Sequence, residues 1–183
     1  LRDAVTAYEY ALSRELPRHD ADRTLLALGS VLGELGRLAE AERAFGVVRE
    51  RAVDDRLVVR ATLDQANVLY AQQRKREALP LYDFLYRRWP NTLKYNPDAL
   101  QQYGDALFDN QELKRGREID LLLFNLFPSH RHAGTVLVRL GDSHSRLGLH
   151  TPAELFYTVA QAEYGDTAAA VVARMRLARN EQE

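Results

Sequence analysis

The chain has 183 residues, of which 46% are hydrophobic and 28% charged, enough apolar material for one ordinary domain or a short solenoid. Its formal net charge of -1 gives no global electrostatic reason to expect nucleic acid or an anionic membrane as a partner. Because the sequence has no cysteine, disulfides, thiolate zinc sites and cysteine nucleophiles are excluded. Glycine and proline are sparse, which favours an all-α fold.

Apolar runs are short throughout the sequence. Runs such as residues 121–124 are far below the roughly 20 residues that a membrane-spanning helix needs. The chain opens at Leu1 without a basic and then apolar leader, so we expect it to be a piece of a larger protein. Its compartment stays open on these grounds.

Apolar residues at helical spacing predict ten helices. In chain order they span approximately residues 2–16, 21–35, 38–52, 56–73, 75–88, 97–109, 112–126, 132–147, 151–164 and 167–180. The expected domain is a single solenoid over residues 1–183. It comprises a half-repeat 1–21, repeats 22–58, 59–96, 97–133 and 134–170, and a half-repeat 171–183.

The repeat rests on two stretches that read almost alike. Leu25-x-x-Leu28-Gly29-x-x-Leu32-x-x-x-Gly36 is followed by Ala41-x-x-x-Phe45, and Leu137-x-x-Leu140-Gly141-x-x-His144-x-x-x-Gly148 by Ala153-x-x-x-Tyr157. Weaker copies place Ala66 and Gly104 between them, so the small residues recur every 37, 38 and 37 positions. We interpret them as points where two helices touch, and Pro90 and Pro128 as stops after the second helix of a hairpin.

This pattern resembles the tetratricopeptide repeat (TPR) family. The resemblance implies a right-handed superhelical solenoid of antiparallel helix pairs with one concave face. Phe127-Pro128-Ser129 leading to Ala133 is similar to a phrase in bacterial cell-envelope TPR proteins, which implies a periplasmic or envelope-associated location. The third repeat departs from the motif, because Gly116 and Asp120 occupy its alanine and aromatic positions, and we expect that hairpin to pack irregularly.

The first helix of each hairpin lines the concave surface in this family, so the resemblance implies a protein-binding groove. Its candidate residues are Asp64, Asn67, Tyr70, Gln101, Asp105, Phe108, Asp109, Arg139, Asp142 and Arg146. Tyr70 and Phe108 are either binding anchors or rings packed on the adjoining helix. The aspartates favour a basic partner segment; the alternatives are a solvated face, or pairing of Asp142 with Arg139 or Arg146.

Metal binding, phosphate binding and catalysis have weaker support in the sequence. His130, His132, His144 and His150 show no metal-ligand spacing, and we expect no metal and no cofactor. Short basic runs such as Arg74-Lys75-Arg76 are followed closely by acids, which favours a solvated edge over phosphate contacts. No phosphate loop, serine elbow or zinc-protease motif occurs, so the sequence predicts no enzyme.

The leading hypothesis is therefore a protein-interaction scaffold within a bacterial envelope-associated assembly. One alternative is a structural module that self-associates through the ends of the solenoid. A remote alternative is an all-helical enzyme.

Overall fold

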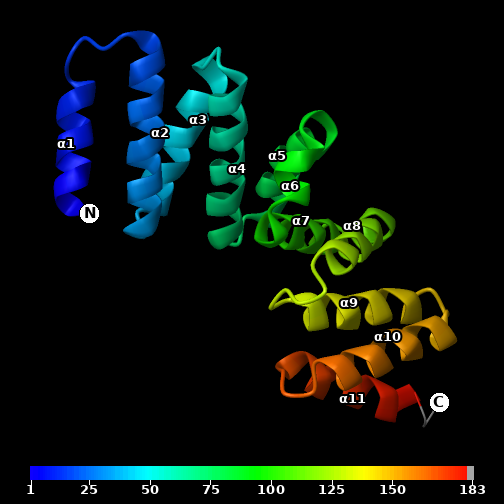
Figure 1. Cartoon of the computed structure of the whole chain (residues 1–183). Coiled ribbons are helices and arrows are strands. Elements are labelled where there is room, and N and C mark those ends of the chain that lie inside the picture. The colour runs from blue at the N-terminus through cyan, green and yellow to red at the C-terminus, as the bar shows by residue number, and fades with distance from the viewer. Residues whose placement is uncertain (181–183) are drawn as a thin grey trace. The chain divides into compact units, whose positions relative to one another are not determined.

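The computed structural model of the chain describes residues 1–180, which contain eleven α-helices and no strand (Figure 1). The helices are α1 (Arg2–Leu12), α2 (Arg18–Glu34), α3 (Leu38–Arg51), α4 (Asp55–Ala71), α5 (Lys75–Arg88), α6 (Pro90–Lys94), α7 (Pro97–Asp109), α8 (Leu113–Leu126), α9 (Ala133–Ser145), α10 (His150–Glu163) and α11 (Ala168–Asn180). The all-α prediction is confirmed, and all ten predicted helices are present.

The short helix α6 was not predicted. Pro90 ends α5 as expected, since α5 stops at Arg88, but it also occupies the first turn of α6. Proline suits that position because its missing N–H would have no partner there in any case. Leu93 of α6 is fully buried, so the extra residues of this repeat form part of the core.

The chain divides into two compact units, Leu1–Tyr95 and the part that begins at Asn96. In the first unit α2 pairs with α3 and α4 with α5, while α1 packs on α2 and α2 contacts α4 (Figure 1). In the second unit α7 pairs with α8 and α9 with α10, and α11 packs on α9 and α10. Both units are thus stacks of antiparallel helical hairpins, and their union in one continuous solenoid stays a prediction.

Every hairpin turn has a residue in the left-handed backbone region. These residues are Gly36 (φ 75°), Gln73 (φ 63°), Gln111 (φ 65°) and Gly148 (φ 72°), spaced 37, 38 and 37 positions apart. In each turn the next N–H bonds to a carbonyl five residues back, as in the 2.9 Å bond from Arg37 to Leu32. This is the helix-ending arrangement that normally selects glycine, and two of the four turns use glutamine instead.

The core of a regular hairpin is an aromatic ring laid on a small residue. A Cβ placed on Gly29 would lie 2.6 Å from Cε1 of Phe45, and one on Gly141 would lie 2.4 Å from Cε1 of Tyr157. Phe45 and Tyr157 are almost fully buried. The glycines therefore let the ring of the second helix reach the backbone of the first.

Candidate functional site

A groove of about 500 Å³ lies in the second unit and is formed by α7, α9 and α11. Its lining residues, here called the second-unit groove, are Asp105, Phe108, Asp109, Gln111, Thr135, Val138, Arg139, Asp142, Ser143, Arg146 and Val172. Helices α7 and α9 are the first helices of their hairpins. The groove thus lies on the face that the sequence predicted to be concave.

Six of the predicted site residues come together here. Asp105, Phe108 and Asp109 come from α7, whereas Arg139 and Asp142 come from α9 and Arg146 caps its end. Gln101 is half-buried on α7, two turns before Phe108, and does not line the groove.

Arg139 is held from two sides by carboxylates. Its Nε and Nη2 donate to Asp120 at 2.7 and 2.5 Å, and its Nη1 donates to Asp105 at 2.8 Å. Asp120 is fully buried, and burial, together with the nearby charge of Asp105, raises the pKa of its carboxyl by more than the contact with Arg139 lowers it. The arginine therefore serves first as the counter-ion of a buried charge and as a link between α7, α8 and α9.

The ring of Phe108 packs on the adjoining helix and also faces the groove. Its ring packs on α8, where a Cβ on Gly116 would lie 2.7 Å from Cε2 of Phe108. The guanidinium of Arg139 lies 5.0 Å from the ring centroid, within the range of a cation–π contact. The ring is half-buried and lines the groove, so it is both packed and accessible.

Asp142 is also engaged within the protein. Its carboxylate accepts hydrogen bonds from the Tyr157 hydroxyl at 2.8 Å and from Nε of Arg176 at 2.7 Å. Burial and this bond raise the pKa of Tyr157. The partner of Asp142 is thus an arginine of α11, 34 residues later, in place of Arg139 or Arg146.

The remaining predicted site residues lie on α4, in the first unit. Asp64 accepts from Nε of Arg60 at 2.6 Å, and burial raises the pKa of Asp64 by more than this bond lowers it. Asn67 accepts from the hydroxyl of the buried Tyr82 at 3.0 Å. Tyr70 is half-buried, with Nζ of Lys75 5.3 Å from its ring centroid.

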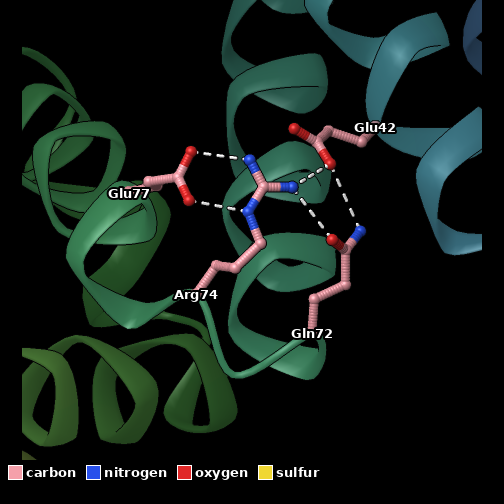
Figure 2. A network of polar contacts seen from close by, with 4 residues as sticks. All are labelled: Glu42, Gln72, Arg74 and Glu77. Atoms are coloured by element: carbon pink, nitrogen blue, oxygen red, sulfur yellow. Dashed lines mark hydrogen bonds and ion pairs between the residues drawn. The ribbon is translucent and has the colours of Figure 1, made fainter.

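Arg74, the first residue of the basic run at residues 74–76, is held in local ion pairs. Figure 2 shows Arg74 between Glu77 of α5 and Glu42 of α3, with Gln72 at the end of α4 bonded to both Arg74 and Glu42. The shortest contacts from Arg74 are 2.5 Å to Glu42 and 2.6 Å to Glu77. These carboxylates raise the pKa of Arg74. The pairs agree with the interpretation of this run as an edge of the fold.

Neither a metal-binding cluster nor a membrane-spanning helix is found within residues 1–180. Nε2 of His130 lies 3.2 Å from Asp98, and no group of three or more acidic or histidine side chains in that range is arranged to hold a metal ion. Of the helices described, none has the length and apolar character needed to cross a membrane.

The fold of the hairpin stack is shared with known proteins. No protein-family model matches the sequence, and no curated protein sequence matches it significantly. Among solved structures, YrrB, "a TPR protein with an unusual peptide-binding site", is similar with a TM-score of 0.77 and 17% identity over 95% of this chain and 83% of that one. The chain has a tetratricopeptide-like fold.

Other structures with the same fold support this assignment. MamA RS-1, as the ArsTM double mutant, has a TM-score of 0.70 and 20% identity over 91% of this chain and 87% of that one. MamA AMB-1 has a TM-score of 0.68 and 16% identity over 93% of each chain. At these identities the likeness concerns the fold alone.

The tetratricopeptide-like register also explains which groove residues sequence reasoning missed. Gln111, Thr135, Val138, Ser143 and Val172 line the groove but are uncharged and not aromatic, so nothing distinguished them from packing residues. Asp120 was recognised as out of place at an aromatic position. A carboxylate at a buried position requires a cation nearby, and that requirement was the available signal for the role of Arg139.

Proposed function

We propose that the chain is a non-enzymatic protein-interaction module whose second-unit groove binds a peptide or protein segment. The observation that carries this proposal is the groove of about 500 Å³ into which six predicted contact residues converge. YrrB, which has a similar fold, is titled as having a peptide-binding site, and this supports a peptide as the ligand here.

The chemistry of the groove favours a segment that carries both apolar and basic side chains. Phe108, Val138 and Val172 supply apolar contact surface. Together with Asp120 beneath the groove, the three lining aspartates still outnumber the arginines that meet them, Arg139, Arg146 and Arg176. A ligand with lysine or arginine beside an apolar residue complements this surface.

A bacterial envelope assembly is the proposed setting, on the strength of the sequence around Pro128. In the structure the carbonyl of Pro128 accepts a 2.5 Å hydrogen bond from the Tyr164 hydroxyl. That bond connects the loop between α8 and α9 to the end of α10. The segment 127–129 therefore also helps to join two repeats.

The test uses one substitution at the rim of the groove, away from the pairs of Arg139 with Asp105 and Asp120 and of Arg176 with Asp142. Asp109 is exposed, so Asp109→Lys makes the groove less acidic with little effect on the core. We expect this variant to lose at least about tenfold in affinity for basic-apolar peptides selected on an array, as charge reversals at an interface do.

A matched control is Glu154→Lys, an exposed charge reversal on α10 that does not line the groove. Because the chain has no cysteine, a single cysteine at position 109 also allows a fluorophore to report peptide binding directly. If Asp109→Lys and the control bind the same peptides with the same affinity as the parent chain, the groove is not the binding site.

Self-association is a second candidate, favoured by apolar side chains on α11. Val171 and Met175 are 48% and 66% exposed on neighbouring turns. Sedimentation velocity across a wide concentration range tests this candidate: an association that Met175→Lys abolishes supports it, and a monomer at every concentration contradicts it.

A further inference from the structure

The outer face of α5 forms a second surface, separate from the second-unit groove. A depression of about 560 Å³ is lined by five residues of this one helix, Pro80, Asp83, Phe84, Arg87 and Arg88, here called the α5 outer face. They follow one another at helical spacing, whereas Ala78, Tyr82 and Leu85 on the opposite side of α5 are fully buried.

Two features of this face cost stability without serving the core. Pro80 stands inside α5, where it removes a backbone hydrogen bond and clashes with the preceding turn, at a cost of about 3 kcal/mol. It is exposed, so any good helix-forming residue fits the position. Phe84, one turn later, is 42% exposed. Departures from local rules of this kind are expected where a surface has a function.

The aromatic part of the face is fixed in place. The rings of Phe84 and Trp89 meet edge to face with centroids 5.4 Å apart. The guanidinium of Arg88 lies 4.9 Å from the centroid of Trp89. An aromatic side chain held in this way loses little conformational entropy on binding, which is why aromatic residues with arginine are frequent at the centres of interfaces.

The charge of the face is positive. Arg87 and Arg88 stand against one acid, Asp83, whose contact with Arg87 is loose at 3.8 Å. Arg87 keeps 75% of its side chain exposed in that contact. A positive, aromatic surface on a chain of net charge -1 complements an acidic segment.

We propose that the α5 outer face binds an acidic peptide segment carrying an aromatic or proline side chain. That side chain packs against Pro80 and Phe84, and flanking carboxylates pair with Arg87 and Arg88. The surface belongs to a second helix of a hairpin, so its use does not depend on the second-unit groove, and the two sites favour ligands of opposite charge.

The experiment uses the whole chain and an array of hexapeptides. Each peptide has a central phenylalanine, proline or alanine flanked by glutamates, glutamines or lysines, and affinities are then measured by fluorescence anisotropy. We expect the glutamate-flanked phenylalanine and proline peptides to bind at least about tenfold more tightly than their lysine-flanked counterparts, with an affinity that falls as salt is raised.

The decisive variant is Phe84→Ser, and Val47→Ser is its matched control. Val47 occupies the same position one repeat earlier, on α3, and is equally exposed at 42%. Phe84→Ser is expected to weaken binding of the acidic peptides about tenfold or more, while Val47→Ser leaves it unchanged. Arg87→Glu with Arg88→Glu is expected to reverse the preference for charge.

Three outcomes overturn the proposal. They are equal binding of acidic and basic peptides, equal losses in Phe84→Ser and Val47→Ser, and the absence of peptide binding together with a self-association that Phe84→Ser abolishes. The last would assign the face to a second copy of this chain. Because both substitutions are at exposed positions, unchanged circular dichroism separates a lost contact from a lost fold.

Discussion

The hairpins α9–α10 and α7–α8 both pack an aromatic ring on a glycine, but the helices that supply the ring and the glycine are exchanged. In α9–α10 the second helix supplies the ring, Tyr157, and the first supplies the glycine, Gly141. In α7–α8 the first helix supplies the ring, Phe108, and the second supplies the glycine, Gly116. The aromatic position of α8 holds Asp120 instead.

This exchange places the carboxylate of Asp120 at the position where a regular hairpin has an aromatic ring. Asp120 lies against Gly104, since a Cβ there would be 2.6 Å from its Oδ1, and Arg139 of the next repeat supplies the counter-charge. Moving the ring to the first helix also moves it toward the groove. The irregular hairpin thus gives up an apolar core contact and gains an aromatic side chain in the groove that we propose as the binding site.

The largest expected effect comes from removing the counter-ion. Arg139→Ala leaves Asp120 buried and unpaired, so we expect the free energy of unfolding to fall by about 3 kcal/mol or more. Urea unfolding followed by circular dichroism measures this loss. Arg146→Ala on the same face is the control and should cost less than about 0.5 kcal/mol. Equal losses in the two variants would show that Arg139 does not compensate a buried charge.

The same network predicts a dependence on pH. Without Arg139 the folded-state pKa of Asp120 rises further above its unfolded value, because burial remains and the opposing contact is gone. Such a group destabilises the fold at every pH above its unfolded pKa; the penalty is complete above the folded-state pKa and shrinks as the pH falls from that value toward the unfolded one. The deficit of Arg139→Ala should therefore shrink as the pH is lowered from 7 toward the ordinary range of an aspartate, by at most about 1.4 kcal/mol per pH unit.

The variant Arg139→Ala with Asp120→Asn is the control for that titration. It has no buried carboxylate at position 120. The difference between its free energy of unfolding and that of the parent chain should therefore not shrink as the pH falls. Asp120→Asn alone should cost less than Arg139→Ala, because Arg139 then keeps Asp105 as a partner. A larger loss in Asp120→Asn than in Arg139→Ala would contradict the role of Arg139 as the counter-ion of Asp120.

A smaller loss of stability is predicted for a substitution in the regular hairpin α9–α10. Gly141→Ala places a Cβ 2.4 Å from the buried ring of Tyr157, so we expect a loss of about 2 kcal/mol from overpacking. Gly33→Ala is the matched control, because that glycine is also helical and has open space around it. Alanine there should stabilise the chain by up to about 1 kcal/mol. Losses of similar size would mean that ring-on-glycine packing is not what selects Gly141.

The sequence predicted the repeat well, because its markers are local. Small residues, leucines and turn glycines at a period of 37 or 38 place the helices to within a few residues. Partners far apart in the chain were not predictable in this way. Arg139 binds a carboxylate 34 residues earlier and Asp142 binds an arginine 34 residues later, and only the stacked repeats bring them together. Helix α6 was missed because Pro90 both ends one helix and starts another.

The smallest predicted effect concerns the turns, which differ between hairpins as the cores do. Gln73 and Gln111 adopt positive φ where Gly36 and Gly148 do so freely, and a side chain there costs about 1–2 kcal/mol. Part of this is offset because glycine gains more entropy in the unfolded chain, so Gln111→Gly should stabilise by about 0.5 kcal/mol. The reverse change, Gly148→Gln, should destabilise by a similar amount in thermal unfolding. If both changes destabilise, the glutamine side chain makes contacts that outweigh the backbone strain, and the turn of the irregular hairpin is specialised along with its core.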